Sequence, residues 1–358
     1  MQQINNYPPF YARLTYILLS LICLAYIAVI GKQILSPLIF SFLFAILLLP
    51  LSNFLEQKLR FPRVMAAILC VVFFIAAMLG IIYLLGSQLS ALGSDWPKLK
   101  FQILITIDNL QDWIEQTFKI NAAKQTKYVN QQTGKLLTTN TAALGETVLS
   151  ISSVLLFLIF TFLYTFFILL KRTLLINFLV ALFDKAHSHI VYNIIEQVKF
   201  IIKKYIVGLV LQMLIVSLLT FMVLSILDVP YALLLGLLTG ILNVIPYVGV
   251  LSALILSMVI TLASASGMQA LWVGAALLGI HVIDGNIIMP IIVGSKVKIN
   301  ALIVIVAVVI GEMLWGISGM FLAIPIIAIA KIIFEKVDGL KPWGLLLGDE
   351  ENLADKVD

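Results

Sequence analysis

His281 and Asp284 are the ionisable residues whose spacing is best suited to shared chemistry. They lie three residues apart in a long apolar run, so a helix presents both on one face. Glu312 lies in the next apolar run. A charge at the centre of a bilayer costs about 2.5–3.5 kcal/mol on insertion scales, so an ionisable residue at that depth indicates a pathway for an ion or polar solute. The structural alternatives are that Asp284 caps a broken helix and that His281 pairs with Glu312.

A second group, formed by Asn243, Pro246, Tyr247 and Gly249, interrupts the preceding apolar run. A helix that breaks at Pro246 frees backbone carbonyl groups, which are tolerated at membrane depth only where they are buried or line a cavity. A plain proline kink is the alternative. The polar residues that we expect on a pathway are Asp284, Glu312, His281, Asn286, Asn243, Tyr247 and Gln212, which is the most polar residue inside the run 206–227.

Glycine and proline interrupt the same part of the chain repeatedly. We expect helix breaks or hinges at Pro246, Gly249, Pro290, Gly294, Gly311, Gly316, Gly319 and Pro325. The three glycines from Gly311 to Gly319 could equally permit close contact between helices, because small residues let two backbones approach.

The composition identifies the class of protein. Of the 358 residues, 62% are hydrophobic and only 11% are charged, against about 25% in soluble domains. Long uncharged apolar runs predict an all-α polytopic membrane protein with about 6–8 transmembrane helices, and the C-terminal half contains two broken or re-entrant helical segments. The lipid bilayer is therefore its first partner. The net charge of +5 comes mainly from basic residues outside the spans, so it indicates orientation and not nucleic-acid binding.

Polarity divides the chain into six predicted segments. They are N-terminal spans at 1–86, an extracytoplasmic polar and amphipathic insert at 87–147, a span at 148–170, cytoplasmic peripheral helices at 171–205, a C-terminal core at 206–335 and a cytoplasmic tail at 336–358. Between Ile103 and Phe118 the insert has apolar residues three and four apart, the pattern of an amphipathic helix. Such a helix could lie on the membrane, pack on the bundle or contact a neighbouring subunit of a homo-oligomer.

Basic residues predict the orientation. Lys58, Arg60 and Arg63 follow the second predicted span, and Lys171 and Arg172 follow the fourth. Both segments then lie on the same side, which the positive-inside rule makes the cytoplasm. Both termini are accordingly predicted to be cytoplasmic.

The segments 231–263 and 300–334 are each longer than a single crossing needs, and each is interrupted. In one model both are broken spans, and Lys296 and Lys298 face outside. In the other model both are re-entrant hairpins around one crossing at about 269–293, and the same lysines face the cytoplasm, as the charge rule favours. The second model also resembles the inverted repeats that transporters use to build a site at the membrane midplane.

The sequence contains no common catalytic motif. There is no GxGxxG, Walker or HExxH motif and no exposed Ser–His–Asp set, so we expect neither enzyme activity nor a cofactor. The two cysteines and three histidines do not form a set of metal ligands. Without a nucleotide site, an ion gradient or passive movement would have to drive any transport.

Two stretches resemble a known family. The sequence DVPYALLLGLLTGILNVIPYVG at 228–249 is similar to the central motif of the autoinducer-2 exporter (AI-2E) family of prokaryotic permeases, and 285–335 is similar to its C-terminal motif. The layout agrees across nearly the whole chain. The matching positions are Asn243, Pro246, Tyr247 and Gly249 in the central motif, and Asp284, Pro290, Gly294, Gly316, Gly319 and Pro325 in the C-terminal one.

This resemblance implies a multi-pass protein of the prokaryotic cell (inner) membrane that exports a small polar solute. Autoinducer-2, a quorum-sensing signal, is the name-giving case, and other members are associated with sodium(lithium)/proton antiport. The family often has Gln where His281 stands and a His-Pro pair where Asn300-Ala301 stand. These departures leave the expected fold intact and affect polar groups near the expected path.

Three functions are therefore considered. The first is a permease or exporter of a small hydrophilic, autoinducer-2-like molecule, in which Asp284 couples to H⁺ or Na⁺. The second is a sodium(lithium)/proton antiporter that uses the same acids. The third is a membrane scaffold that transports nothing and recruits partners through the insert.

Overall fold

The computed structural model describes residues 9–118, 142–245, 248–292 and 299–348. In these ranges all the regular secondary structure is helical. Six helical stretches are long and apolar enough to cross a membrane: Lys32–Gln57, Arg63–Thr106, Ser152–Ala181, Lys185–Ile226, Gly267–Ile292 and Ile317–Lys336. Shorter apolar helices accompany them. The prediction of an all-α polytopic membrane protein is confirmed.

The chain divides into two compact units. Unit 1 comprises Met1–Leu49, Phe157–Lys199 and Lys298–Asp358, and unit 2 comprises Pro50–Leu156 and Phe200–Val297. Three helices contribute residues to both units, namely α2 (Lys32–Gln57), α5 (Ala142–Ala181) and α6 (Ser188–Ile226). Unit 1 also contains α1 (Phe10–Ile30), η1 (Lys185–His187), α11 (Ala301–Trp315), α12 (Ile317–Lys336), η3 (Asp338–Leu340) and α13 (Lys341–Leu347).

Unit 2 contains α3 (Arg63–Phe118), α7 (Ala232–Leu242), α8 (Val248–Ser264), α9 (Gly267–Ile283), η2 (Asp284–Ile288) and α10 (Met289–Ile292). The segment boundaries predicted after residues 86, 147, 170 and 205 fall inside α3, α5 and α6. A change of polarity along a helix does not interrupt its backbone hydrogen bonds, so composition alone does not end these helices.

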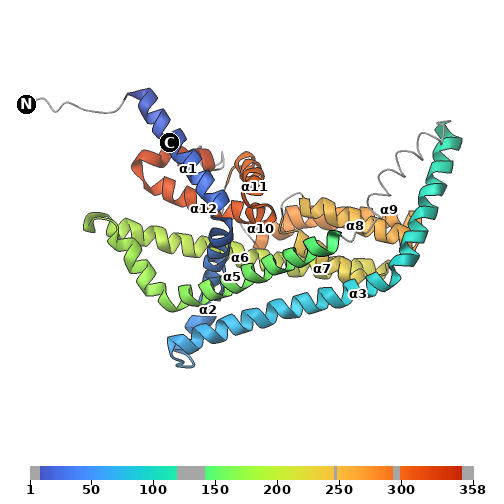
Figure 1. Ribbon diagram of the computed structural model, residues 1–358, viewed down its shortest axis with the longest axis horizontal. Helices are drawn as coiled ribbons and strands as arrows, with labels where there is room; N and C mark the ends of the chain where they lie inside the picture. Colours follow the sequence, from blue (N-terminus) through green and yellow to red (C-terminus); the bar gives the residue numbers. More distant parts are fainter. Residues whose placement is uncertain (1–8, 119–141, 246–247, 293–298, 349–358) are drawn as a thin grey trace, which may run out of the picture. The chain divides into compact units, whose positions relative to one another are not determined.

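Figure 1 shows that α3 bends along its course, and Pro97 lies inside it. A proline removes one backbone hydrogen bond and is a common cause of such bends.

The segment 231–263 folds as a helical hairpin. Its arms are α7, with 11 residues, and α8, with 17 residues, or about 16 and 26 Å at 1.5 Å per residue. The arms meet closely at the tip, because a Cβ atom on Gly249 would lie 1.7 Å from the Leu242 carbonyl oxygen. Only a glycine permits this approach of two backbones.

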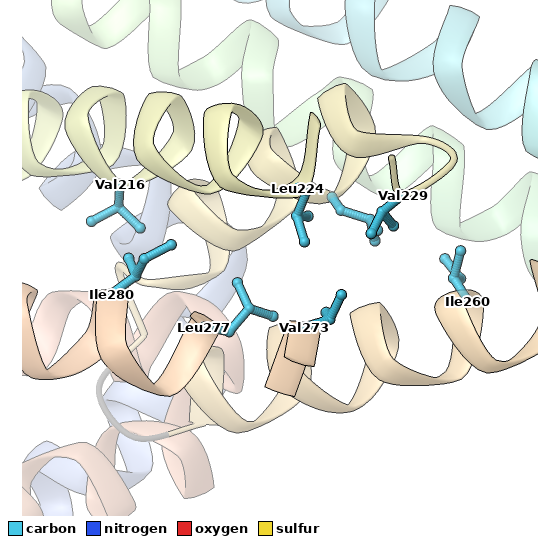
Figure 2. Packing of buried hydrophobic residues seen from close by; sticks show 8 residues of the cluster. Val216, Leu224, Val229, Ile260, Val273, Leu277 and Ile280 are labelled. Atoms are coloured by element: carbon cyan, nitrogen blue, oxygen red, sulfur yellow. The ribbon is translucent and has the colours of Figure 1, made fainter. Parts of the chain in front are cut away.

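The hairpin packs against α6 and α9 through an apolar core. The buried members of this core are Val216, Leu224, Val229, Leu235, Ile260, Val273, Leu277 and Ile280. Figure 2 shows the labelled side chains of α6 and α9 pointing toward one another. Leu235 and Ile260 come from the two arms of the hairpin, so both arms contribute to one core.

Both ends of this hairpin lie at the same end of unit 2. Leu227, just after α6, precedes the first arm, and Gln269, in the first turn of α9, follows the second. The Gln269 side-chain amide donates a hydrogen bond to the Leu227 carbonyl oxygen at 2.5 Å. The chain therefore enters and leaves the hairpin at neighbouring points, the arrangement that the re-entrant model of this segment requires.

The segment 300–334 also folds back on itself. Gly316 separates α11 from α12 and has a φ of 65°, a conformation that residues with a side chain rarely adopt. Near this turn the two helix backbones touch, because a Cβ atom on Gly319 would lie 1.9 Å from the Gly311 carbonyl oxygen. In α11, the Trp315 indole N–H donates to the Ala28 carbonyl oxygen of α1 at 2.8 Å, which ties the hairpin to α1.

Gly319→Ala is expected to destabilise this hairpin, because the new methyl group would have to push α11 and α12 apart. We expect a loss of about 1–3 kcal/mol in the free energy of unfolding, as for other overpacked contacts. Denaturant unfolding in detergent micelles measures it. Gly279→Ala is the matched control, since a Cβ atom there has no neighbour within 4 Å. Equal stability of the two variants would contradict the close contact.

Candidate functional site

Asp284 is a buried carboxylate at the point where α9 changes its helical geometry. Its side chain is 6% exposed. It begins the π-helical segment η2, in which the Met289 N–H donates to the Asp284 carbonyl oxygen, five residues away. A π turn contains one residue more than an α turn needs, is costly in isolation and occurs often at functional sites. Among the described residues from α9 to α10, Asp284 therefore lies at the one turn that is not α-helical.

Two side-chain amides hold this carboxylate. Gln212 of α6 donates from Nε2 to both Asp284 oxygens, at 3.0 Å and 2.9 Å. Asn243, at the end of α7, donates from Nδ2 to Oδ2 at 2.8 Å. Three of the residues predicted from the sequence therefore meet at one point, although they are 41 and 72 residues apart along the chain.

The partners of Asp284 are neutral. In the described parts of the chain, no Lys or Arg nitrogen lies within the 4.0 Å of an ion pair with it. A buried carboxylate without a counter-charge is costly, and its hydrogen bonds offset only part of that cost. An arrangement of this kind favours binding of a proton or another cation at Asp284.

His281 lies one helical turn before Asp284 on α9. Both of its ring nitrogens are buried, and neither has a hydrogen-bond partner among the described residues. Buried polar atoms are rarely left without a partner, so each such case needs an explanation. The imidazole is a second titratable group at the site, available to a proton or to a polar ligand.

Two glycines bring Asn243 within reach of Asp284. A Cβ atom on Gly236 would lie 2.8 Å from the Ser217 carbonyl oxygen, and one on Gly240 would lie 2.4 Å from the Met213 carbonyl oxygen. Helices α6 and α7 therefore cross with their backbones nearly in contact. The sequence analysis missed both residues, although their spacing, small-x-x-x-small, is the known signal for close helix packing in membranes.

The remaining predicted residues lie elsewhere. Asn286 is exposed, and its side chain donates to the Val282 carbonyl oxygen at 2.8 Å. Pro290 is exposed in α10, and Pro325 is buried inside α12. Glu312 belongs to unit 1, where it is exposed. Pro246, Tyr247 and Gly294 lie outside the described residues.

Metal binding has no support in the described ranges, where His, Cys, Asp and Glu side chains form no group of three or more suited to hold a metal ion.

Comparison with known sequences gives the family. The model of the AI-2E family transporters matches residues 17–339. The chain belongs to the AI-2E family. This match spans both hairpins and all the residues of the site, so the predicted family is confirmed. The protein is accordingly a multi-pass membrane protein of a transporter family.

Individual relatives agree with this assignment. The chain is 27% identical over 322 residues to the AI-2 transport protein TqsA of Escherichia coli (strain K12), covering 89% of this chain and 90% of the relative. It is 34% identical over 133 residues to the putative transport protein YrrI of Bacillus subtilis (strain 168), covering 36% of each chain. It is 29% identical over 125 residues to the putative transport protein YhhT of Escherichia coli (strain K12), covering 35% of this chain and 36% of the relative.

Gln212→Leu is expected to destabilise the protein, because it removes an amide that serves both Asp284 oxygens. The expected loss is about 1–3 kcal/mol, the range for a buried polar group left without its partner. Unfolding in detergent measures it. In an Asp284→Leu background the same change should cost much less, since no carboxylate remains to be satisfied. An equal loss in both backgrounds would show that the hydrogen bonds do not contribute.

Proposed function

We propose that this protein is a secondary transporter of a small hydrophilic molecule and that Asp284 is its coupling group. The observation that supports the proposal most directly is the buried carboxylate held by two amides without a cationic partner among the described residues. Ionisable residues at membrane depth are expensive and mark ion pathways. Membership of a transporter family points to the same class of function.

The amide partners suit a group that changes its protonation state. An ionised carboxylate only accepts hydrogen bonds, and the amide nitrogens of Gln212 and Asn243 supply them. A protonated carboxyl group donates one hydrogen bond, which the oxygen of a rotated amide accepts. Lysine or arginine partners would stabilise only the ionised form. The site therefore accommodates Asp284 with and without its proton.

His281 provides a second position for the proton. Its unpartnered ring nitrogens lie one turn from Asp284 on the same helix. Histidine exchanges protons near neutral pH in ordinary surroundings. We assign His281 as a relay between Asp284 and the aqueous phase, with Asn286 as a further polar group along the path.

The solute is proposed to bind at the tip of the first hairpin. Asn243 ends α7, and the turn that follows carries backbone carbonyls for a polar ligand, with Tyr247 beside it in sequence. TqsA is named as an AI-2 transport protein. A small polar molecule of similar kind is the first candidate solute for this chain, with export as the direction.

A sodium(lithium)/proton antiporter is the second candidate. The carboxylate of Asp284 and the amide oxygens of Gln212 and Asn243 are all hard oxygen ligands once the amides rotate. The same group would then bind either Na⁺ or H⁺. In a scaffold that transports nothing, the third candidate, Asp284 and its two amides would have a structural role only.

Flux measurements on the purified full chain in proteoliposomes test these functions. Under an imposed pH gradient, the wild type should move autoinducer-2, and Asp284→Asn should reduce the rate at least tenfold by removing the titratable group. His281→Gln should slow the rate and change its pH profile. A control variant has to lie away from the helix contacts, which excludes Gln269→Glu, because the Gln269 side chain donates a hydrogen bond to the Leu227 carbonyl oxygen. Ser87→Ala is suitable, because Ser87 bonds only to its own helix on an exposed face.

The outcomes separate the candidates. Sodium-dependent proton movement that Asp284→Asn abolishes, without solute flux, supports the antiporter. Absence of all flux, with cellular function retained in Asp284→Asn, would overturn both transport proposals.

The orientation also stays a proposal. We infer from the basic residues that both termini face the cytoplasm and that the 87–147 region lies outside. On that assignment, the common end of the first hairpin opens toward the outside.

A further inference from the structure

The turn between α6 and α7, residues 227–231, has an unusual backbone. Asp228 and Tyr231 have φ angles of 52° and 59°, in the left-handed region that residues other than glycine seldom occupy. Two such residues within four positions persist only where the surroundings hold them. Val229, between them, is 5% exposed and belongs to the core of unit 2.

Two long-range hydrogen bonds hold this turn. The Tyr231 hydroxyl donates to Oδ2 of Asp95 on α3 at 2.5 Å. The Gln269 amide of α9 donates to the Leu227 carbonyl oxygen at the other end of the turn. Asp95 lies two residues before Pro97 on α3. The bond to Asp95 ties the start of α7 to α3, a helix outside the α6–α9 group.

The turn and Asn243 lie at opposite ends of α7. Tyr231 immediately precedes α7, and Asn243 immediately follows it. A helix is a stiff rod of about 1.5 Å per residue, so a rotation at its first residue moves its far end by many times the local displacement. A rotation of α7 about Tyr231 would therefore carry the Asn243 amide away from the carboxylate.

We propose that Asp95 and Tyr231 form a latch that keeps the α7–α8 hairpin closed over Asp284, and that residues 227–231 are the hinge on which the hairpin opens. Release of the hydroxyl from Asp95 lets the strained backbone at Tyr231 relax toward an ordinary conformation. The α7 arm then swings from α6, and Asp284 loses Asn243 and gains access to water. This step gives the proposed transporter its alternating exposure of the coupling group.

The Tyr231–Asp95 hydrogen bond can open through movement of its two groups, without a change in the protonation of Tyr231. The hydrogen bond to Asp95 raises the pKa of Tyr231 to about 12, and Tyr231 lies outside the apolar helices, so the hydroxyl stays a donor over the physiological pH range. The Asp95 side chain is 46% exposed and also faces Lys98 at 4.0 Å. Water can replace either partner, so breaking the bond leaves no buried group unsatisfied.

Thiol labelling of the full chain in liposomes tests the latch without any transport assay. Cysteine is introduced by Ser257→Cys, at a fully buried position of α8, in a Cys23→Ser, Cys70→Ala background. The probe is 2-aminoethyl methanethiosulfonate. With the latch intact, labelling should be slow. Tyr231→Phe removes only the hydroxyl and should raise the labelling rate about tenfold.

Two further variants sharpen the result. Lys98→Gln is the matched control, since it removes the other neighbour of Asp95 and leaves the Tyr231 bond in place, so its labelling rate should equal that of the parent. Asp95→Leu should accelerate labelling as much as Tyr231→Phe, and the double variant should add nothing, because both remove one bond.

Three results of the labelling experiment would contradict the latch. They are an unchanged rate in Tyr231→Phe, equal acceleration in Lys98→Gln, and additive effects of Asp95→Leu and Tyr231→Phe. A lowered thermal unfolding midpoint that tracks the labelling rate in all the variants would identify general loosening, which also contradicts a specific latch.

The role of the latch in transport rests on the proposed function, but the labelling experiment does not depend on it. Accelerated labelling in a protein that moves no solute or ion would retain the latch and reject the transporter. Flux that depends on Asp284, together with unchanged labelling in Tyr231→Phe, would support the transporter and reject the latch.

Discussion

A carboxylate placed in an apolar interior must be surrounded by hydrogen-bond donors, and this requirement organises unit 2. Water is absent from the bilayer core, and electrostatic interactions there are strong because the dielectric constant is low. Asp284 meets the requirement with one amide from α6 and one from α7. Both amides are short side chains, so three helices have to converge within a few ångströms. The rest of the unit makes this convergence possible.

Backbone proximity is the means of convergence. Gly236 and Gly240 remove the side chains that would separate α7 from α6, and Gly249 lets the second arm begin against the end of the first. Dispersion and close packing drive helix association in lipid, where there is no hydrophobic force between helices. The apolar core of α6, the hairpin and α9 then fixes the register of the helices, which sets the positions of the polar groups.

The sequence predicted the fold class and the site's chemical groups, but not their geometry. Asp284, Gln212 and Asn243 stand out because a polar residue in a long apolar run is expensive, and that cost depends only on local composition. Which helix faces which depends on contacts between distant residues. Tyr231 and Asp95 are 136 residues apart along the chain, and no local sequence pattern predicts their contact.

The segment boundaries drawn from polarity do not coincide with helix ends, for a related reason. Polarity changes near residues 86 and 205, yet α3 and α6 run through both points because nothing there interrupts the backbone hydrogen bonds. Breaks were located where glycine or proline alters the backbone itself, as at Gly316. The close packing at Gly236 and Gly240 was detectable from spacing, but in a region rich in glycine it did not stand apart from the other small residues.

The π turn at Asp284–Ile288 has a consequence for the helical run from α9 to α10. Each residue of an α-helix advances the direction of its side chain by about 100°. One surplus residue therefore offsets the face presented after the turn from the face presented before it. Helix α9 contributes Val273, Leu277 and Ile280 to the apolar core, and the residues of α10 present a face offset from that alignment. Asp284 is the residue at which the alignment changes.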